Sequence, residues 1–132
     1  MTKLANLLSS LQTASLNKTT SIIINYNLLV LKACALLEDL GYISGFTIIN
    51  SKKLKVYLRY YKNASVIRSA RLFSKPSSRV YFKRRLFFKK NFKNSLQTNS
   101  FIIVSTSRSP MLFTDLECHL MNSGGEPLFL IS

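Results

Sequence analysis

Acidic residues are scarce in this sequence: 5 Asp and Glu stand against 19 Lys and Arg, which gives a net charge of +14. No acidic residue lies between Leu40 and Thr114, whereas 15 of the basic residues lie between Lys52 and Lys93. Self-repulsion at this charge costs stability, and solubility alone does not require a long stretch without acids. The imbalance therefore predicts a polyanionic partner, with nucleic acid the first candidate and an anionic membrane surface the second.

Cysteine and histidine are also scarce, with two and one in the chain. Cys34 and Cys118 lie far apart, His119 is the only histidine, and no metal-ligand spacing connects them, so no metal site is predicted. Both cysteines stand beside apolar residues in helical patterns, which indicates buried free thiols in a reducing compartment. A P-loop and a GxGxxG motif are absent, and Ser107, His119 and Asp115 lack a supporting motif for a catalytic triad. We therefore expect no cofactor, no small-molecule substrate and no enzymatic activity.

Long hydrophobic runs are missing as well. The longest apolar stretch, Leu28 to Leu40, contains three charged residues and is shorter than the ~20 residues that span a bilayer. The first arginine is Arg59, whereas transit peptides are rich in arginine. The sequence thus predicts no transmembrane segment and no cleavable targeting peptide, so that either the protein works where it is made or the sequence is already that of the mature protein.

Residues 1–64 show the periodicities of a small α/β sandwich. Apolar residues at helical spacing, β-branched runs and one glycine stop predict the order helix, strand, helix, strand, strand, at Leu4–Leu11, Thr19–Asn25, Leu28–Leu40 (with Gly41 as the stop), Tyr42–Ile49 and Lys53–Tyr60. In the last strand Leu54, Val56 and Leu58 share one face, while Lys53 and Lys55 share the other. That strand is expected to present cations to a partner.

Residues 65–132 predict a second, mainly-β lobe with one short helix, so that the expected class is α+β with two small lobes. Strands are expected at Ser65–Phe73, at the apolar run before Ser105 and at Pro127–Ile131, and a capping box at Thr114–Glu117 begins the helix. Within the basic run, Tyr81 stands between Arg79 and Lys83 at strand spacing, which favours an exposed ring beside two phosphate-binding cations. The segment Leu86 to Gln97 fits either a loop or a basic amphipathic helix.

Two short loops in this lobe carry the residue types of a nucleic-acid site. Ser105, Thr106, Ser107 and Arg108 follow a buried strand, and Gly124, Gly125 and Glu126 precede the last one. Short hydroxyl side chains donate and accept hydrogen bonds, glycines permit close backbone approach, and a carboxylate accepts from base amino groups. These properties suit the shallow minor groove of an RNA helix.

The ordered set STSR, Thr114–Asp115 and GGE resembles the C-terminal signature of the small-subunit ribosomal protein eight family, bacterial type. The stretch LLEDLGYI, ending at Ile43, is similar to that family's second helix, and the stretch Ser74–Tyr81 is similar to its Ser-Lys-Pro-Gly-x-Arg-x-Tyr segment. The resemblance covers nearly the whole chain. It implies a protein that binds an irregular helix in the central domain of small-subunit ribosomal RNA, beside ribosomal proteins five and two, with the RNA contacts in the hydroxyl loop, the Gly-Gly-Glu loop and Tyr81.

The chain departs from that pattern in three places. The loop at Ser109–Phe113 is longer, Ser10 and Gln12 replace arginines of the first helix, and Lys83–Asn99 matches poorly. A composition heavy in Phe, Leu, Ile, Asn and Lys is typical of an AT-rich organelle genome, which favours an organelle-encoded mitochondrial protein over a plastid one. The alternative is a peripheral membrane protein anchored by Lys83–Lys93. Membrane anchoring would not require the cations on the strand that begins at Lys53, so the presence of these cations favours the RNA hypothesis.

Overall fold

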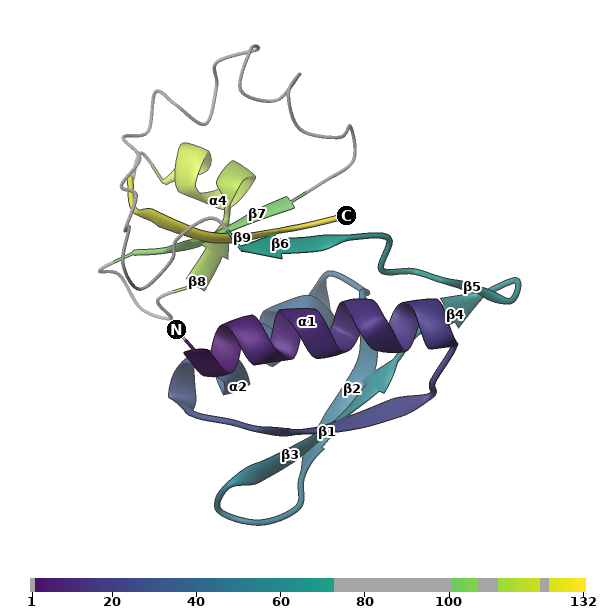
Figure 1. The fold of residues 1–132 in the computed structure, drawn as a ribbon. Helices are drawn as coiled ribbons and strands as arrows, with labels where there is room; N and C mark the ends of the chain where they lie inside the picture. The colour runs from purple at the N-terminus through teal and green to yellow at the C-terminus, as the bar shows by residue number, and fades with distance from the viewer. Residues whose placement is uncertain (1, 73–100, 107–111, 122–123) are drawn as a thin grey trace. The chain divides into compact units, whose positions relative to one another are not determined.

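A computed structural model describes residues 2–72, 101–106, 112–121 and 124–132 (Figure 1). The chain divides into two compact units, Met1–Ala70 and Arg71–Ser132. The first mixes helices with an antiparallel sheet, and the second is mainly β with a short helix, which confirms the predicted α+β class with two lobes. The assignment of RNA binding to a lobe of residues 65–132, and its boundary at residue 65, stay predictions.

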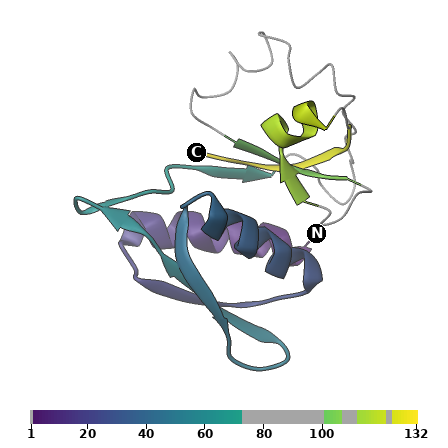
Figure 2. The ribbon, with the colours of Figure 1, turned by 180° about the vertical axis from the view of Figure 1, so that it is seen from behind.

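The first unit is a three-stranded antiparallel sheet covered on one face by two helices. Its elements are α1 (Thr2–Asn17), β1 (Ser21–Asn25), α2 (Leu28–Asp39), β2 (Ile43–Ile48) and β3 (Lys53–Leu58), and the strand order is β1-β3-β2. Front and rear views both place α1 and α2 on the same side of the sheet (Figures 1 and 2). Apolar residues of these elements form its core, among them Leu4, Leu7, Leu11, Val30, Cys34, Leu37, Leu54 and Val56.

Local sequence fixes both ends of α2. The Asn27 side chain accepts a hydrogen bond from the Val30 N–H at 3.0 Å, which caps the first turn. At the other end Gly41 has a φ of +85°, and the next residue, Tyr42, donates its N–H to the Leu37 carbonyl at 2.9 Å. This is a Schellman ending, which needs a left-handed residue after the helix. Gly41 therefore ends the helix as predicted.

A short hairpin follows β3, in place of part of one predicted strand. β4 (Tyr60–Tyr61) pairs with β5 (Ala64–Ser65) through Lys62 and Asn63, both of which have positive φ. A two-residue turn of this kind matches the twist of a hairpin and folds the chain back. The strand predicted over Ser65–Phe73 is therefore wrong as one element, because its first residue belongs to the hairpin and a strand resumes only at β6 (Ala70–Leu72).

The second unit is a four-stranded sheet with the order β6-β9-β7-β8. Its other strands are β7 (Phe101–Ser105), β8 (Leu112–Thr114) and β9 (Glu126–Ile131), and α4 (Asp115–Leu120) follows β8 directly. Cys118 of α4 packs in a buried cluster with Ile102, Val104 and Leu130, with Phe113 against it. The sheet and α4 thus share one apolar core.

The start of α4 has the predicted capping box. The Thr114 N–H donates to Glu117 Oε2 at 3.3 Å, and the Glu117 N–H donates to Thr114 Oγ1 at 3.3 Å. The two side chains satisfy each other's backbone donors at the helix start. The box also fixes where β8 ends, because Thr114 is at once the last residue of the strand and the cap of the helix.

None of the helices among the described residues combines the length and the apolar character that crossing a membrane requires.

Candidate nucleic-acid interface

The two predicted loops of the second unit meet at one end of its sheet. Ser105, the last residue of β7, pairs with Glu126 at the start of β9 and with Leu112 at the start of β8. The pairing of Ser105 with Glu126 therefore brings the hydroxyl segment and the Gly-Gly-Glu segment together in space, although they lie far apart in the sequence. We call this end of the sheet, formed by Ser105, Thr106, Gly125 and Glu126, the C-terminal edge.

Gly125 is in close contact with β7. A Cβ built on this residue would collide with the Ser105 carbonyl oxygen and lie 2.8 Å from Val104 Cγ1. Real side chains do not approach backbone so closely, so only glycine fits without a shift of the strand. From the sequence we expected Gly125 to allow the close approach of a partner. The structure shows that a glycine is also needed within the unit, because a side chain would collide with β7.

Glu126 places a carboxylate at the C-terminal edge, and part of its capacity to accept hydrogen bonds is unused by the described residues. The side chain is half-buried, and its Oε1 atom is buried without a hydrogen-bond partner in the described part of the chain. A buried acceptor that lacks a donor costs free energy. The carboxylate is therefore suited to accept a hydrogen bond from an incoming donor.

The hydroxyl residues at this edge are less exposed than ordinary loop residues. Ser105 is half-buried, and Thr106 is buried, with 6% of its surface accessible. Both are therefore held by the surrounding packing, which gives their backbone a defined position. The edge is small and mostly uncharged.

The outer face of the first unit's sheet has the opposite character. On β3, Lys53 is exposed, while Lys55 and Tyr57 are half-buried, and both helices lie on the other side of the sheet (Figure 1). The Lys55 ammonium lies 5.3 Å from the centroid of the Tyr57 ring, which is a cation–π distance. We call this surface, formed by Lys53, Lys55 and Tyr57, the basic strand face.

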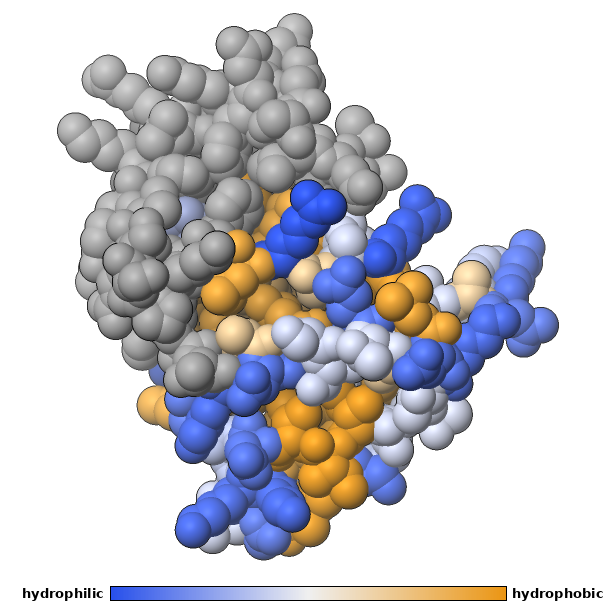
Figure 3. Space-filling view, in the orientation of Figure 1, coloured by the Kyte–Doolittle hydropathy of each residue, from blue (hydrophilic) through white to orange (hydrophobic). Residues whose placement is uncertain are grey.

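The strand register adds neighbours that sequence reasoning missed. Lys53 pairs with Asn25, Lys55 with Ile23 and Thr47, and Tyr57 with Ser21 and Gly45. None of these neighbours is acidic, and Ile23 is 59% exposed. Figure 3 shows hydrophilic residues gathered at the end of the β2–β3 hairpin and an apolar patch over β1. Only the pairing of β3 with β1 and β2, which a sequence does not reveal, could have identified these neighbours.

Both cysteines are withdrawn from solvent. Neither Cys34 nor Cys118 has accessible surface, and burial raises the pKa of Cys34 to about 12 and that of Cys118 to about 11. Glu117 and Asp115 add to the effect at Cys118, because their negative charges oppose formation of a thiolate. The thiols are free, as the sequence predicted. Within the described ranges, no three His, Cys, Asp or Glu side chains are grouped to hold a metal ion.

Several predicted residues lie outside the described residues. They are Arg79, Tyr81, Lys83, Ser107 and Arg108, together with the segment 83–99 and positions 109–111 of the long loop.

Comparison with known proteins gives a consistent result. The family model described as "Ribosomal protein S8" matches residues 2–131. The chain is 30% identical to "Small ribosomal subunit protein uS8m" of Acanthamoeba castellanii over 132 residues, which cover 100% of both chains. It is 31% identical to "Small ribosomal subunit protein uS8" of Mycoplasmopsis pulmonis over 131 residues, which cover 97% of this chain and 94% of that one. With the uS8 protein of Wigglesworthia glossinidia brevipalpis it shares 38% identity over 93 residues, 69% of this chain and 66% of that one.

Proposed function

The chain belongs to the ribosomal protein S8 family, and we propose that it binds small-subunit ribosomal RNA directly through two surfaces with different tasks. The RNA is an irregular helix of the central domain. The C-terminal edge, extended by Ser107, Arg108 and Gly124, distinguishes this helix from others. The basic strand face, with Arg79, Tyr81 and Lys83 of the following segment, holds the RNA backbone.

One observation carries this proposal, namely the pairing of Ser105 with Glu126 beside Gly125. It brings a hydroxyl, a carboxylate with an unused acceptor and a stretch of backbone without a side chain to the same place. Such a surface can approach a shallow minor groove and bond to 2′-hydroxyls and base edges. A surface that bound only phosphates would need cations there instead.

The charge distribution supports the second task. Lys53 and Lys55 are on the uncovered face of the sheet, and no acidic residue is paired with them across the strands. Cations that neutralise phosphates raise affinity for any RNA and release counterions, so that binding weakens with salt. The basic strand face therefore contributes affinity, and the C-terminal edge contributes selectivity.

The setting we propose is the small ribosomal subunit of a mitochondrion, beside ribosomal proteins five and two. The support is the full-length similarity to a uS8m protein and the AT-rich type of composition. A plastid is the alternative setting. The protein acts there as a structural component, without catalysis.

Binding to a fragment of the cognate central-domain RNA, compared with a mismatched RNA helix over a salt series, tests the two tasks. Ser105→Ala should weaken binding to the cognate helix by about fivefold and leave the mismatched helix unchanged, which corresponds to one hydrogen bond of about 1 kcal/mol. Ser15→Ala is the matched control, because that hydroxyl donates only within α1, to the Gln12 carbonyl. Lys53→Ala/Lys55→Ala should weaken both RNAs alike and reduce the salt slope by about 1.5.

A wild-type protein that showed no preference for the cognate RNA would contradict the proposal. Binding to anionic vesicles with no affinity for either RNA would instead support the peripheral membrane alternative.

A further inference from the structure

The first unit contains a hollow beside the β4–β5 hairpin that the two proposed surfaces leave unused. Its volume is about 450 Å³, and its lining includes Gly41, Arg59, Tyr61, Ser65, Val66 and Arg68. We call it the hairpin hollow. We propose that the hairpin hollow receives one unpaired nucleotide of ribosomal RNA, whose phosphate binds Arg59 and Arg68 and whose base stacks on Tyr61. This inference rests on the proposed binding of that RNA.

Two features of the fold position the backbone that carries the lining. The Val66 N–H donates to the Arg59 carbonyl at 3.1 Å, which ties the chain after the hairpin to the chain before it. Lys62 and Asn63, with φ of 50° and 62°, close the hairpin turn. The backbone that carries the lining is thus part of a hydrogen-bonded element.

Arg59 is positioned by a glycine. Its Nη1 atom lies 3.3 Å from the place that a Cβ of Gly41 would occupy, so that the absence of a side chain leaves room for the guanidinium. Gly41 is the second residue after α2, next to the carboxyl end, where the helix dipole favours a positive charge. The guanidinium thus has room beside Gly41 at the hollow, and Arg59 is exposed and accessible to a ligand.

The positive charge in the hollow is not neutralised within the unit. Arg59 and Arg68 are both exposed, and neither forms an ion pair in the described part of the chain. The acids nearest in sequence, Glu38 and Asp39 in the last turn of α2, form no ion pair with them there either. A guanidinium binds phosphate oxygens through two parallel hydrogen bonds, and two guanidinium groups at one hollow favour a phosphate over a single carboxylate.

Tyr61 and Ser65 supply the other contacts that a nucleotide needs. Tyr61 is 68% exposed, and the Lys62 ammonium lies 5.4 Å from its ring centroid. An exposed ring beside cations can stack on any base, because each base has a π face. Ser65 Oγ is buried with no hydrogen-bond partner among the described residues, and a phosphate or ribose oxygen that enters the hollow can provide one.

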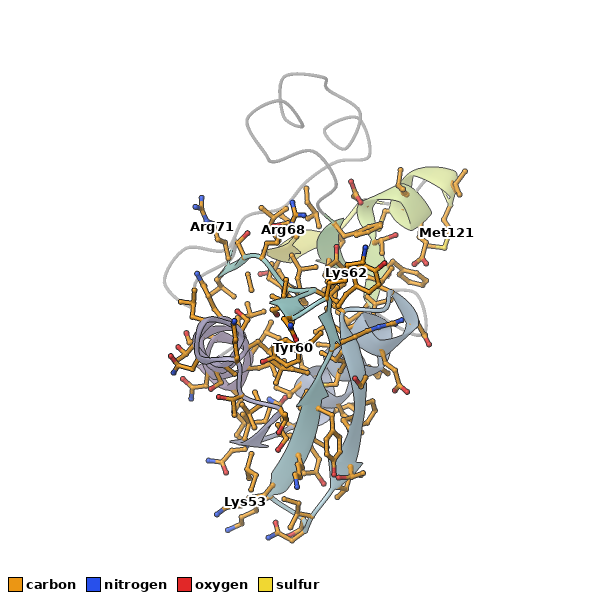
Figure 4. All side chains as sticks on the ribbon, turned by 90° about the vertical axis from the view of Figure 1, so that its right-hand side faces the viewer. Lys53, Tyr60, Lys62, Arg68, Arg71 and Met121 are labelled. Atoms are coloured by element: carbon orange, nitrogen blue, oxygen red, sulfur yellow. The ribbon has the colours of Figure 1, made fainter. Side chains whose placement is uncertain are left out.

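The size and the place of the hollow point to a single nucleotide. A volume of this order suits a small ligand and is too small for an RNA duplex. Figure 4 shows Lys53 at one end of the unit, with Lys62 and Arg68 toward the other, so that the hollow is separate from the exposed end of the basic strand face. RNA that crosses the unit could therefore be held at both ends.

The test is the titration of ¹⁵N-labelled full-length protein with the central-domain RNA fragment, together with affinities of variants. The backbone signals of Ser65 and Val66 should shift on addition of RNA. Arg59→Gln/Arg68→Gln should weaken binding more than tenfold, whereas Lys18→Gln/Lys32→Gln, which removes the same charge elsewhere on the unit, should weaken it about threefold. Tyr61→Leu should weaken binding about fivefold, whereas Tyr61→Phe, which keeps the stacking face, should bind as tightly as the wild type.

The outcomes separate this inference from the proposed function. If the wild type binds the RNA but the two signals do not move, or if the arginine and lysine pairs weaken binding equally, the hollow does not hold RNA and the inference fails alone. Binding of a synthetic acidic peptide at the hollow, with RNA affinity unchanged in the arginine variant, would also overturn it and indicate a protein partner. If the wild type does not bind the RNA, the proposed function fails and this inference with it.

Discussion

The basic strand face and the C-terminal edge are built by different physical means. The basic strand face consists of side chains that leave a regular strand toward solvent, and its chemistry resides in charges that could be moved without disturbing the core. The C-terminal edge consists of residues packed against backbone, where Gly125 contacts Ser105 and an acceptor of Glu126 is buried. A surface of exposed charges should tolerate substitution, and its affinity for RNA should change in proportion to the charge removed. A packed edge should instead lose stability after a single substitution.

The largest expected effect is at the C-terminal edge. Gly125→Ala should destabilise the protein by about 3 kcal/mol, because the new methyl group has to displace the Ser105 carbonyl or the Val104 side chain. Denaturant unfolding, followed by circular dichroism, measures the change. Gly45→Ala on β2 is the matched control, since its methyl group would meet no described atom closer than 3.8 Å. Equal stability of the two variants would remove the distinction between the regions.

A smaller effect is expected from the helix caps, one in each unit. Thr114→Ala removes the acceptor for the Glu117 N–H, and Asn27→Ala removes the acceptor for the Val30 N–H, each at a cost of about 1 kcal/mol. Each loss should raise the reactivity of the thiol in its own unit about fivefold, Cys118 in the first variant and Cys34 in the second. Labelling of native protein with a thiol reagent, read by mass spectrometry, measures both rates. A cap substitution that exposed both thiols equally would show that the units do not open separately.

The smallest effect concerns pH. Burial raises the pKa of Cys34 in the folded protein, so that the unfolded chain loses its thiol proton first as the pH rises above about 9. The stability contributed by the neutral thiol is therefore complete below pH 9 and declines from there toward pH 12. Urea midpoints at pH 8 and pH 10 should differ less in Cys34→Ala than in the wild type. The same pH dependence in both proteins would assign the decline to other groups, such as Tyr42 and Tyr60, whose pKa values burial also raises.

The sequence was sufficient where local rules decide the structure. The alternation from Lys53 to Leu58 correctly separated buried from outward residues, Gly41 marked the end of α2, and Thr114 with Glu117 marked the start of α4. Each of these features depends on residues within one turn or one strand. The cation-bearing face could be predicted for the same reason, although its use stays a prediction.

Features that depend on distant residues could not be predicted in this way. The contact of Gly125 with Ser105 requires the pairing of β7 with β9, and the neighbours of Lys55 require the pairing of β3 with β1 and β2. The hairpin at Lys62 and Asn63 was missed because both residues adopt positive φ without a glycine. Asparagine tolerates this conformation better than most residues, whereas lysine gives no such signal.

One irregularity in the second sheet makes the spacing of residues as important as their identity. Ile103 pairs with Phe129, but the next residue, Val104, pairs with Pro127, so that Leu128 is passed over and Glu126 lies across from Ser105. In a regular ladder Pro127 would take that place, and proline has no N–H to donate. Pairing of Leu128 with Val104 would restore a regular ladder, move Pro127 across from Ser105 and withdraw the carboxylate. In a β9 of this length the bulge at Leu128 therefore places the carboxylate, and relatives of equal length that keep this edge should keep the bulge while the residues on either side of it vary.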